Sequence, residues 1–201
     1  MTTILFLVGS LRTDSLNARL ARVAAHELPE GYEAAYFDIG GLPFYSGDLE
    51  GERTPGIVSE FRDALRNADG VFFTTPEYNY ALPGLVKNAL DWASRPMRPR
   101  NAIVGKPMNA AVATISATNG VRSLNDLKRI WGNCGGVTVA SFDFVLQNAP
   151  AKFIDHDGVE TLEPLSLATL RFALENLERL IEHKAGQVVE ANWDAFVKQT
   201  T

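Results

Sequence analysis

Short apolar runs alternate with amphipathic segments along this chain, and this alternation restricts the possible folds more than any other feature. The run at 4–8 is continuously apolar and ends at a Gly-Ser pair. An apolar run of strand length predicts a strand buried on both faces, as in the centre of a parallel sheet. The segment that follows carries apolar residues at helical spacing. Together the two segments predict a strand–helix unit.

The alternation continues along the rest of the chain. Further strands are expected at 34–39, 71–75, 108–115 and from 137 to 140. Helices are expected at 15–26, 57–68, 85–92, 122–131 and 167–181, where apolar residues recur every three or four positions. The residues after Gly186, which include Trp193 and Phe196, are expected to form a tail docked on the body.

Five strands joined by helices predict an α/β fold, a doubly wound sandwich in which helices cover both faces of a parallel sheet. The strand order 2-1-3-4-5 is one of two orders common in such sheets, and periodicity does not choose between them. With 201 residues and no repeat or low-complexity tract, the chain is expected to form one domain over 1–201.

The balance of charge argues against polyanionic partners. The formal net charge is -5, from 24 acidic and 19 basic residues, so no overall positive field favours nucleic acid or an anionic membrane surface. The first residues lack basic side chains, and the run at 4–8 is too short for a signal peptide or a membrane span. The single cysteine, Cys134, excludes an intrachain disulfide. These features predict a cytoplasmic protein.

In doubly wound sheets, ligands bind beyond the carboxyl ends of the strands, so the loops there are candidate sites. The loop 9–17 leads into a helix, whose first N–H groups and dipole favour an anion. Ser10, Ser15 and Asn17 add neutral donors, and Arg12 adds a charged one. The spacing of a dinucleotide or nucleoside-triphosphate motif is missing. The loop is either a phosphate site or a simple helix cap, and its sequence alone does not decide.

Prolines stiffen the loop 76–84, which follows the third strand. Its tyrosines and backbone N–H groups suit a flat heteroaromatic ligand, and a stiffened turn with tyrosines on the surface is the alternative. Metal chemistry is not indicated, because the three histidines, His26, His156 and His183, are too scattered for a ligand pattern. The G-x-S-x-G nucleophile elbow of a hydrolase is also missing.

Two separated motifs are together more specific than either loop alone. The first is Gly9-Ser10-Leu11-Arg12 with Ser15 and Asn17, and the second is Pro76-Glu77-Tyr78-Asn79 with Pro83-Gly84, Lys87-Asn88 and Asp91-Trp92. In this combination the sequence resembles the NADPH-dependent FMN reductase family, which includes bacterial quinone, chromate and azo-dye reductases. The resemblance is strong from the first strand to Trp92 and looser up to the helix at Arg122.

The resemblance implies a flavodoxin-like three-layer sandwich with a five-stranded parallel sheet in the order 2-1-3-4-5. It implies FMN as cofactor and NADPH or NADH as electron donor, with no catalytic side chain and no metal ligand, because the flavin carries the chemistry. The implied cofactor-binding residues lie around the phosphate (Ser10, Arg12, Ser15, Leu16, Asn17), at the edge of the ring, chiefly through backbone groups (Pro76, Glu77, Tyr78, Asn79), and in the loop 116–120 on the other side of the ring (Ser116).

The implied function is that of an enzyme, an NAD(P)H-dependent FMN/quinone reductase. Hydride would pass through FMN to a quinone or a similar small acceptor, such as free flavin, an azo compound or chromate, with ping-pong kinetics. The alternatives are an FMN-binding electron carrier and a redox-responsive regulatory flavoprotein without nicotinamide turnover. Neither nucleic acid nor a membrane is an expected partner. The dimers and tetramers of relatives imply a homodimer or homotetramer.

Two features are left open by the sequence. Tyr80 stands where relatives commonly have a small residue such as glycine, and its ring either narrows the approach to the flavin or stacks on the donor or acceptor. Arg95, Arg98 and Arg100 form a basic cluster in an acidic chain. The cluster either grips the nicotinamide phosphates or is a solvated loop or subunit contact.

Overall fold

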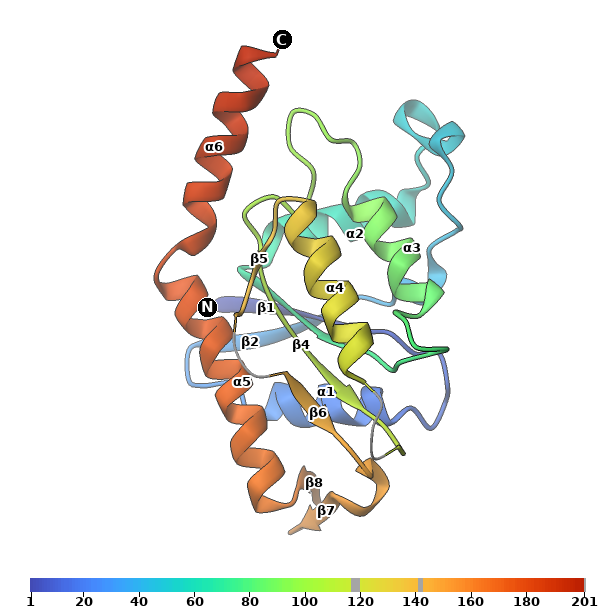
Figure 1. The fold of residues 1–201 in the computed structure, drawn as a ribbon, viewed down its shortest axis with the longest axis vertical. Coiled ribbons are helices and arrows are strands. Elements are labelled where there is room, and N and C mark those ends of the chain that lie inside the picture. The colour runs from blue at the N-terminus through green and yellow to red at the C-terminus, as the bar shows by residue number, and fades with distance from the viewer. Residues whose placement is uncertain (117–119, 141–142, 201) are drawn as a thin grey trace.

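The centre of the molecule is a parallel sheet (Figure 1), seen in a computed structural model that describes residues 1–116, 120–140 and 143–200. The strands run in the order β2-β1-β3-β4-β5, and β6 also pairs with β4. Their bounds are β1 (Thr2–Val8), β2 (Tyr32–Tyr36), β3 (Gly70–Thr74), β4 (Pro107–Ala113), β5 (Val137–Thr138) and β6 (Phe144–Leu146). This order is that of the flavodoxin-like class, which confirms the order implied by the resemblance.

Two short strands share the fifth position of the sheet. β5 pairs with the beginning of β4, where Pro107 lies opposite Val137, and β6 pairs with its end, where Ala111 lies opposite Phe144. The sequence predicted one strand starting at Val137 and continuing to 140. The structure ends β5 at Thr138 and resumes pairing six residues later, with 141–142 outside the described residues.

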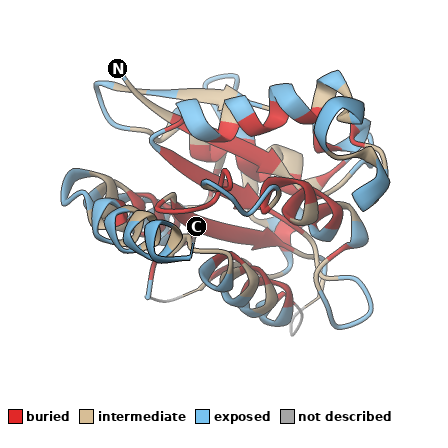
Figure 2. Ribbon diagram, turned by 90° about the horizontal axis from the view of Figure 1, so that it is seen from above, coloured by how far each residue is buried: buried red, intermediate tan, exposed pale blue. Residues whose placement is uncertain are grey.

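Helices cover both faces of the sheet and complete three layers. On one face lie α1 (Leu16–His26) and α5 (Pro164–Glu182), and on the other lie α2 (Gly56–Asn67), α3 (Gly84–Ala93) and α4 (Val121–Asn133). Figure 2 shows the buried residues in the sheet and on the inward sides of the helices. The predicted three-layer sandwich is thus confirmed. None of the helices in the described part of the chain is long and apolar enough to cross a membrane.

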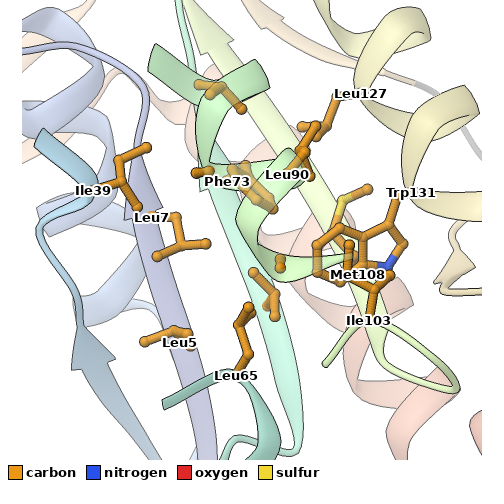
Figure 3. Close-up of a cluster of buried hydrophobic side chains, with 14 of the residues drawn as sticks. Leu5, Leu7, Ile39, Leu65, Phe73, Leu90, Ile103, Met108, Leu127 and Trp131 are labelled. Carbon is orange, nitrogen blue, oxygen red and sulfur yellow. The ribbon is translucent and has the colours of Figure 1, made fainter. Parts of the chain in front are cut away.

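Side chains that alternate between the two faces of the central strands create the two halves of the core. Leu5 and Leu7 of β1 pack with α2, α3 and α4 in one cluster, while Ile4 and Phe6 pack with α1 and α5 in the other. Successive side chains of a strand point to opposite faces, so a strand buried on both faces is apolar throughout. Figure 3 shows the first cluster, in which Phe73 lies near Trp131.

The structure adds elements that the sequence did not predict. The second strand lies at Tyr32–Tyr36 rather than 34–39, because Ile39 begins a short 3-10 turn capped by Asp38. A hairpin of β7 (Phe153–His156) and β8 (Val159–Leu162) precedes α5. The turn that begins at Ile39 is η1 (Ile39–Gly41), and the described residues also form the 3-10 turns η2 (Gly47–Leu49), η3 (Gly51–Arg53) and η4 (Ala149–Ala151).

The expected tail is the helix α6 (Ala185–Gln199), which extends away from the sheet in Figure 1. Trp193 is attached as predicted, since its indole N–H donates to the carbonyl of Pro99 at 3.0 Å. Phe196 is 56% exposed, so the prediction that it packs on the body is wrong. The helix is held mainly by its polar face and by its first turn, where Gly186 is buried.

Candidate functional site

A pocket of about 650 Å³ opens at the carboxyl ends of β1, β3 and β4, where ligands of doubly wound sheets bind. Every predicted cofactor-binding residue except Asn79 lines it. The full lining is Ser10, Arg12, Asp14, Ser15, Leu16, Asn17, Arg19, Pro76, Glu77, Tyr78, Ala113, Thr114, Ile115, Ser116 and Pro150. The three loops that the sequence selected are therefore brought together at one site.

Gly9 allows β1 to turn sharply into the first of these loops. Its N–H donates to the carbonyl of Thr74 at 2.8 Å, so the backbones of the two strands meet here. A Cβ at this position would lie 2.5 Å from Thr75 Oγ1 and 2.6 Å from Val86 Cγ2. Because those contacts are far inside van der Waals distance, only glycine fits without displacing its neighbours.

The loop after β1 presents donors at the beginning of α1. Ser15 caps the helix, and its hydroxyl oxygen accepts from the N–H of Ala18 at 3.1 Å. The first-turn N–H groups of Leu16 and Asn17 lie beyond the reach of helical acceptors. The Arg12 side chain is exposed, and no carboxylate of the described residues forms an ion pair with it. Capping leaves the hydroxyl proton of Ser15 available to an anion, so the cap and the phosphate site are compatible.

Asn17 has a structural role that the sequence did not predict. Its side chain is 3% exposed, and its amide bonds the backbone of Ala113 twice. Nδ2 donates to the carbonyl of Ala113 at 3.0 Å, and Oδ1 accepts from the N–H of Ala113 at 2.8 Å. Asn17 therefore ties the beginning of α1 to the end of β4. A phosphate contact through the other Nδ2 hydrogen stays a prediction.

Glu77 lines the pocket, and contacts with the protein fix its side chain. Its side chain is 2% exposed. One carboxylate oxygen accepts from the N–H groups of Gly120 at 2.8 Å and Arg122 at 3.1 Å, and the other accepts from the Arg122 guanidinium at 3.1 Å. Burial raises the pKa of this carboxyl, but these donors outweigh it and hold the pKa below the ordinary value. The side chain is thus engaged by protein, which leaves backbone groups to meet a ligand.

Asn79 and Tyr80 form the tip of a tight turn outside the pocket. The N–H and carbonyl groups of Tyr78 and Ala81 bond each other, both at 3.1 Å, which closes a two-residue hairpin. The φ angles are 50° at Asn79 and 65° at Tyr80, a left-handed pair that favours Asn-Gly. The Tyr80 ring is 72% exposed, and the Arg122 guanidinium lies 5.0 Å from its centre.

The loop after β4 is described only in part. Ser116 lines the pocket, and its N–H donates to Thr114 Oγ1 at 3.1 Å, while its predicted contact with the ring stays a prediction. The expected contacts of residues 117–119 lie outside the described residues. Gly120 has a φ of 127°, a conformation that favours glycine, and its N–H is the one that Glu77 binds. The turn after β3 is therefore tied to the beginning of α4.

Asn88 and Trp92 of the second motif hold a loop and do not line the main pocket. The indole of Trp92 donates to the carbonyl of Pro43 at 2.7 Å. The amide of Asn88 donates to the same carbonyl at 3.0 Å and accepts from the N–H of Tyr45 at 2.8 Å. Both side chains are buried in α3. They fix the long connection between β2 and α2 against the body.

The basic cluster lies away from the pocket. The segment 95–106 precedes β4 and so lies at the opposite edge of the sheet, where α3 has ended. Arg100 pairs with Glu190 at 3.0 Å and Asp194 at 2.9 Å, and Arg98 donates to Thr200 at 2.8 Å. Both arginines attach α6, which argues against a grip on nicotinamide phosphates within one chain. Arg95 lies 6.0 Å from the Tyr45 ring.

Sequence reasoning missed some residues of the pocket. Arg19 lies four positions after Ser15, so one helical turn separates them on the same face, and this spacing was a usable signal. Pro150 comes from η4, far along the chain, and no local pattern marks it. Over the described ranges, no group of three or more His, Cys, Asp or Glu residues is arranged to hold a metal ion.

A smaller cavity of about 380 Å³ adjoins the main pocket and shares Ser10, Arg12 and Tyr78 with it. Its other lining residues are Gly9, Leu11, Pro83, Gly84 and Leu85. The site thus offers a polar end at the beginning of α1 and a second, largely apolar recess on the far side of Tyr78. Such an arrangement suits one ligand with an anionic group and a planar ring, and a second ligand beside the ring.

The chain is similar to known flavin-dependent reductases. A family model described as NADPH-dependent FMN reductase matches residues 2–151. A 2-hydroxy-1,4-benzoquinone reductase from Burkholderia sp is 39% identical over 154 residues, which cover 77% of this chain and 79% of that protein. An NAD(P)H-dependent FMN reductase from Pseudomonas aeruginosa is 42% identical over 114 residues, which cover 57% of this chain and 60% of that protein.

A solved structure agrees in fold over nearly its full length. FerB, a flavoenzyme NAD(P)H:(acceptor) oxidoreductase from Paracoccus denitrificans, superposes with a TM-score of 0.81 at 30% identity. The superposition covers 92% of this chain and 99% of that one. All residues that line the main pocket fall within the part of the chain that the family model matches.

Proposed function

Because this chain belongs to the NADPH-dependent FMN reductase family, we propose that it is an enzyme that oxidises NAD(P)H with bound FMN and reduces a quinone or a similar small acceptor. The observation that carries this proposal is the single pocket that joins the anion-binding beginning of α1 to the turn 76–81. The balanced reaction converts NAD(P)H, a proton and a quinone into NAD(P)⁺ and a hydroquinone.

The residues of the pocket fit FMN at both of its ends. At the phosphate end stand the first-turn N–H groups of α1, the hydroxyls of Ser10 and Ser15 and the guanidinium of Arg12, a donor set that suits a dianion. At the ring end, Pro76 and Tyr78 line the pocket, and the ring of Tyr78 and nearby backbone groups suit a planar ligand. A pocket of about 650 Å³ is in the range of cofactor sites.

When bound, FMN supplies the redox chemistry by accepting hydride from the reduced nicotinamide and delivering two electrons to the acceptor. The protein binds and orients. We assign Ser10, Arg12, Ser15, Leu16 and Asn17 to the phosphate end, and Pro76, Glu77, Tyr78 and Ser116 to the ring end. We assign Asn79, which lies outside the pocket, to the turn that shapes the ring end. No side chain is assigned a proton transfer.

The adjoining cavity suits the second substrate. It lies beside Tyr78 and is lined largely by apolar groups such as Leu11 and Leu85, so a nicotinamide or quinone ring can enter it. One recess beside one ring means that donor and acceptor take turns, and ping-pong kinetics follow. The exposed ring of Tyr80, at the tip of the neighbouring turn, borders the approach to this region.

We further propose a homodimer or homotetramer that covers the mouth of the pocket. Large apolar side chains of the loops that carry the site are strongly exposed: Leu11 and Ile115, which line the two cavities, at 67% and 76%, and Tyr80, at the tip of the turn after β3, at 72%. Large exposed apolar residues often mark an interface. The lone cysteine is unpaired, which suits a reducing compartment, and we therefore assign the enzyme to the cytoplasm.

The direct test is turnover. Purified protein reconstituted with FMN should carry a bound flavin spectrum that bleaches on anaerobic addition of NADPH or NADH, and its colour should return when a benzoquinone is added. Steady-state rates at several quinone concentrations should give parallel double-reciprocal lines. A protein that binds FMN but never bleaches with either nicotinamide would instead be an electron carrier or a redox-responsive regulator. A protein that binds no FMN would refute the assignment altogether.

A further inference from the structure

Arg19 lines the pocket from α1, although no motif on the loops includes it. It lies one turn after the cap residue Ser15, and the two share a face of the helix. Side chains of a helix lean toward its N-terminus, and Arg19 lines the same pocket as Ser15 and Leu16 at that end of the helix. Arg19 thus belongs to the phosphate end of the pocket by position.

The hairpin of β7 and β8 holds the Arg19 side chain in this place. Nε donates to Glu160 Oε1 at 2.9 Å, and Nη2 lies 2.7 Å from the same oxygen in an ion pair. The guanidinium carbon lies 4.1 Å from the centre of the Phe153 ring, in a cation–π contact. Register pairs Phe153 with Leu162 and Asp155 with Glu160, so Phe153 and Glu160 lie on one face of the hairpin. That face meets α1.

The hairpin is a firm support. It packs against α1 and α5 (Figure 1), with Leu162 only 1% exposed. Phe153 and Glu160 both lie after residue 151, where the family match ends. The two residues that hold Arg19 therefore lie in a part of the chain that the family model does not match.

The guanidinium keeps donors for a ligand. Glu160 accepts a hydrogen bond from Nε and lies beside Nη2, and the rest of the fork is not needed for that pair. The side chain is 31% exposed, and it borders the pocket rather than being enclosed by protein. Arg12 approaches the same end from an exposed loop. A phosphate monoester carries nearly two charges at neutral pH, and the donors of Arg12, Arg19 and the helix N-terminus suit it, although Glu160 offsets the charge of Arg19 and Asp14 lines the same pocket.

We propose that Arg19, oriented by Glu160 and Phe153, is a second phosphate-binding arginine and makes the pocket select FMN over riboflavin. The proposal rests on the proposed function, because it assumes that the pocket holds a flavin. It assigns the hairpin a role in cofactor selection rather than in the reaction itself.

The test compares binding of FMN and of riboflavin, followed by quenching of flavin fluorescence. Arg19→Met keeps much of the apolar stem but removes the charge, so it should weaken FMN binding roughly tenfold and leave riboflavin binding unchanged. Arg19→Lys keeps the charge without the fork and should lose part of the FMN affinity. Arg22→Met removes the same charge from an exposed position on the same helix and should bind FMN as the unmodified protein does.

The outcomes separate this proposal from the proposed function. If the unmodified protein and Arg19→Met bind FMN with equal affinity, the proposed role of Arg19 is overturned and the proposed function stands. Equal weakening of FMN and riboflavin, or equal weakening by Arg22→Met, would also overturn it, because the effect would then be structural or a general effect of charge. If Arg19→Met does not fold, Arg19→Lys decides. The proposal is contradicted if Arg19→Lys binds FMN as tightly as the unmodified protein does and its FMN affinity depends on salt concentration to the same degree. If the unmodified protein binds no FMN, the proposed function itself fails.

Discussion

Glu77 carries its charge at a place where its side chain is 2% exposed, and three donors of Gly120 and Arg122 stabilise that charge. These hydrogen bonds connect the turn after β3 to the beginning of α4. Because the pKa in the folded protein lies below the ordinary carboxyl value, the ionised form stabilises the fold above that ordinary value. The stabilisation is lost as the pH falls through the folded-state pKa.

A Glu77→Gln variant should therefore be less stable at neutral pH by about 1–2 kcal/mol, since a charged acceptor becomes a neutral one. The free energy of unfolding, measured in urea at several pH values, should show this gap narrowing as the pH falls below 4.5, the ordinary value for the carboxyl. Glu30→Gln, at an exposed position, serves as control and should change little. If the difference in unfolding free energy between the two proteins is constant with pH, the charge of Glu77 does not stabilise the fold.

Tyr80 occupies a backbone conformation that favours glycine, with a φ of 65°. Alanine and glycine both remove the ring and its contact with Arg122, so comparing them isolates the backbone. Tyr80→Gly should be more stable than Tyr80→Ala by about 1 kcal/mol, because a Cβ in the left-handed region is strained. Thermal melts of the two variants measure the difference. Greater stability of the alanine variant would show that the turn is not left-handed in solution.

At the scale of elements, α6 depends on a few polar contacts. Arg100 pairs with Glu190 and Asp194, but all three side chains are between 37% and 44% exposed, so solvent screens the pairs. Arg100→Ala should cost less than about 1 kcal/mol of global stability. It should nonetheless speed amide hydrogen exchange along α6, where local opening is easiest. Arg129→Ala, whose arginine pairs with Asp126 in α4, should leave exchange in α6 unchanged.

The sequence was sufficient to predict the elements with a regular pattern of burial. β3 and β4 are buried throughout and β1 along its middle, so each is recognisable as an apolar run, and the apolar stripes of α1 to α5 mark their buried sides. The hairpin of β7 and β8 was missed because most of its residues are exposed and polar. The division of the fifth position into β5 and β6 depends on pairing with β4, which local periodicity does not encode.

The candidate site could be predicted to the same extent. Motifs on the loops located nine of the fifteen lining residues, because loops at the carboxyl ends of parallel strands converge. Pro150 was missed because its place depends on contacts between distant segments, and Arg19 was missed because it lies outside the loop motifs, although its spacing from Ser15 places it on the same helix face. Asn88 and Trp92 carry the same family motif but hold the loop at Pro43, and sequence alone does not separate a residue that binds a ligand from one that supports the fold.

At the scale of the whole molecule, flavin binding should be visible as stability. A ligand present at 100 times its dissociation constant stabilises the folded state by about 2.7 kcal/mol. For a chain of this size, FMN at that excess should raise the melting temperature by about 5–10 °C. Differential scanning calorimetry with and without FMN measures the shift, and AMP, which has a phosphate but no flavin ring, is the control ligand. Equal shifts with both would mean that the ring is not bound.

The two ties made by Asn17 and Glu77 have a consequence for how quickly a cofactor is taken up. One clamps the helix that starts at Leu16 to the end of a neighbouring strand, and the other clamps the tyrosine turn to the helix that starts at Val121. A pocket whose loops are already held in place loses little conformational entropy when a ligand binds. Uptake should then follow a single exponential whose rate rises linearly with flavin concentration, without a plateau from slow rearrangement.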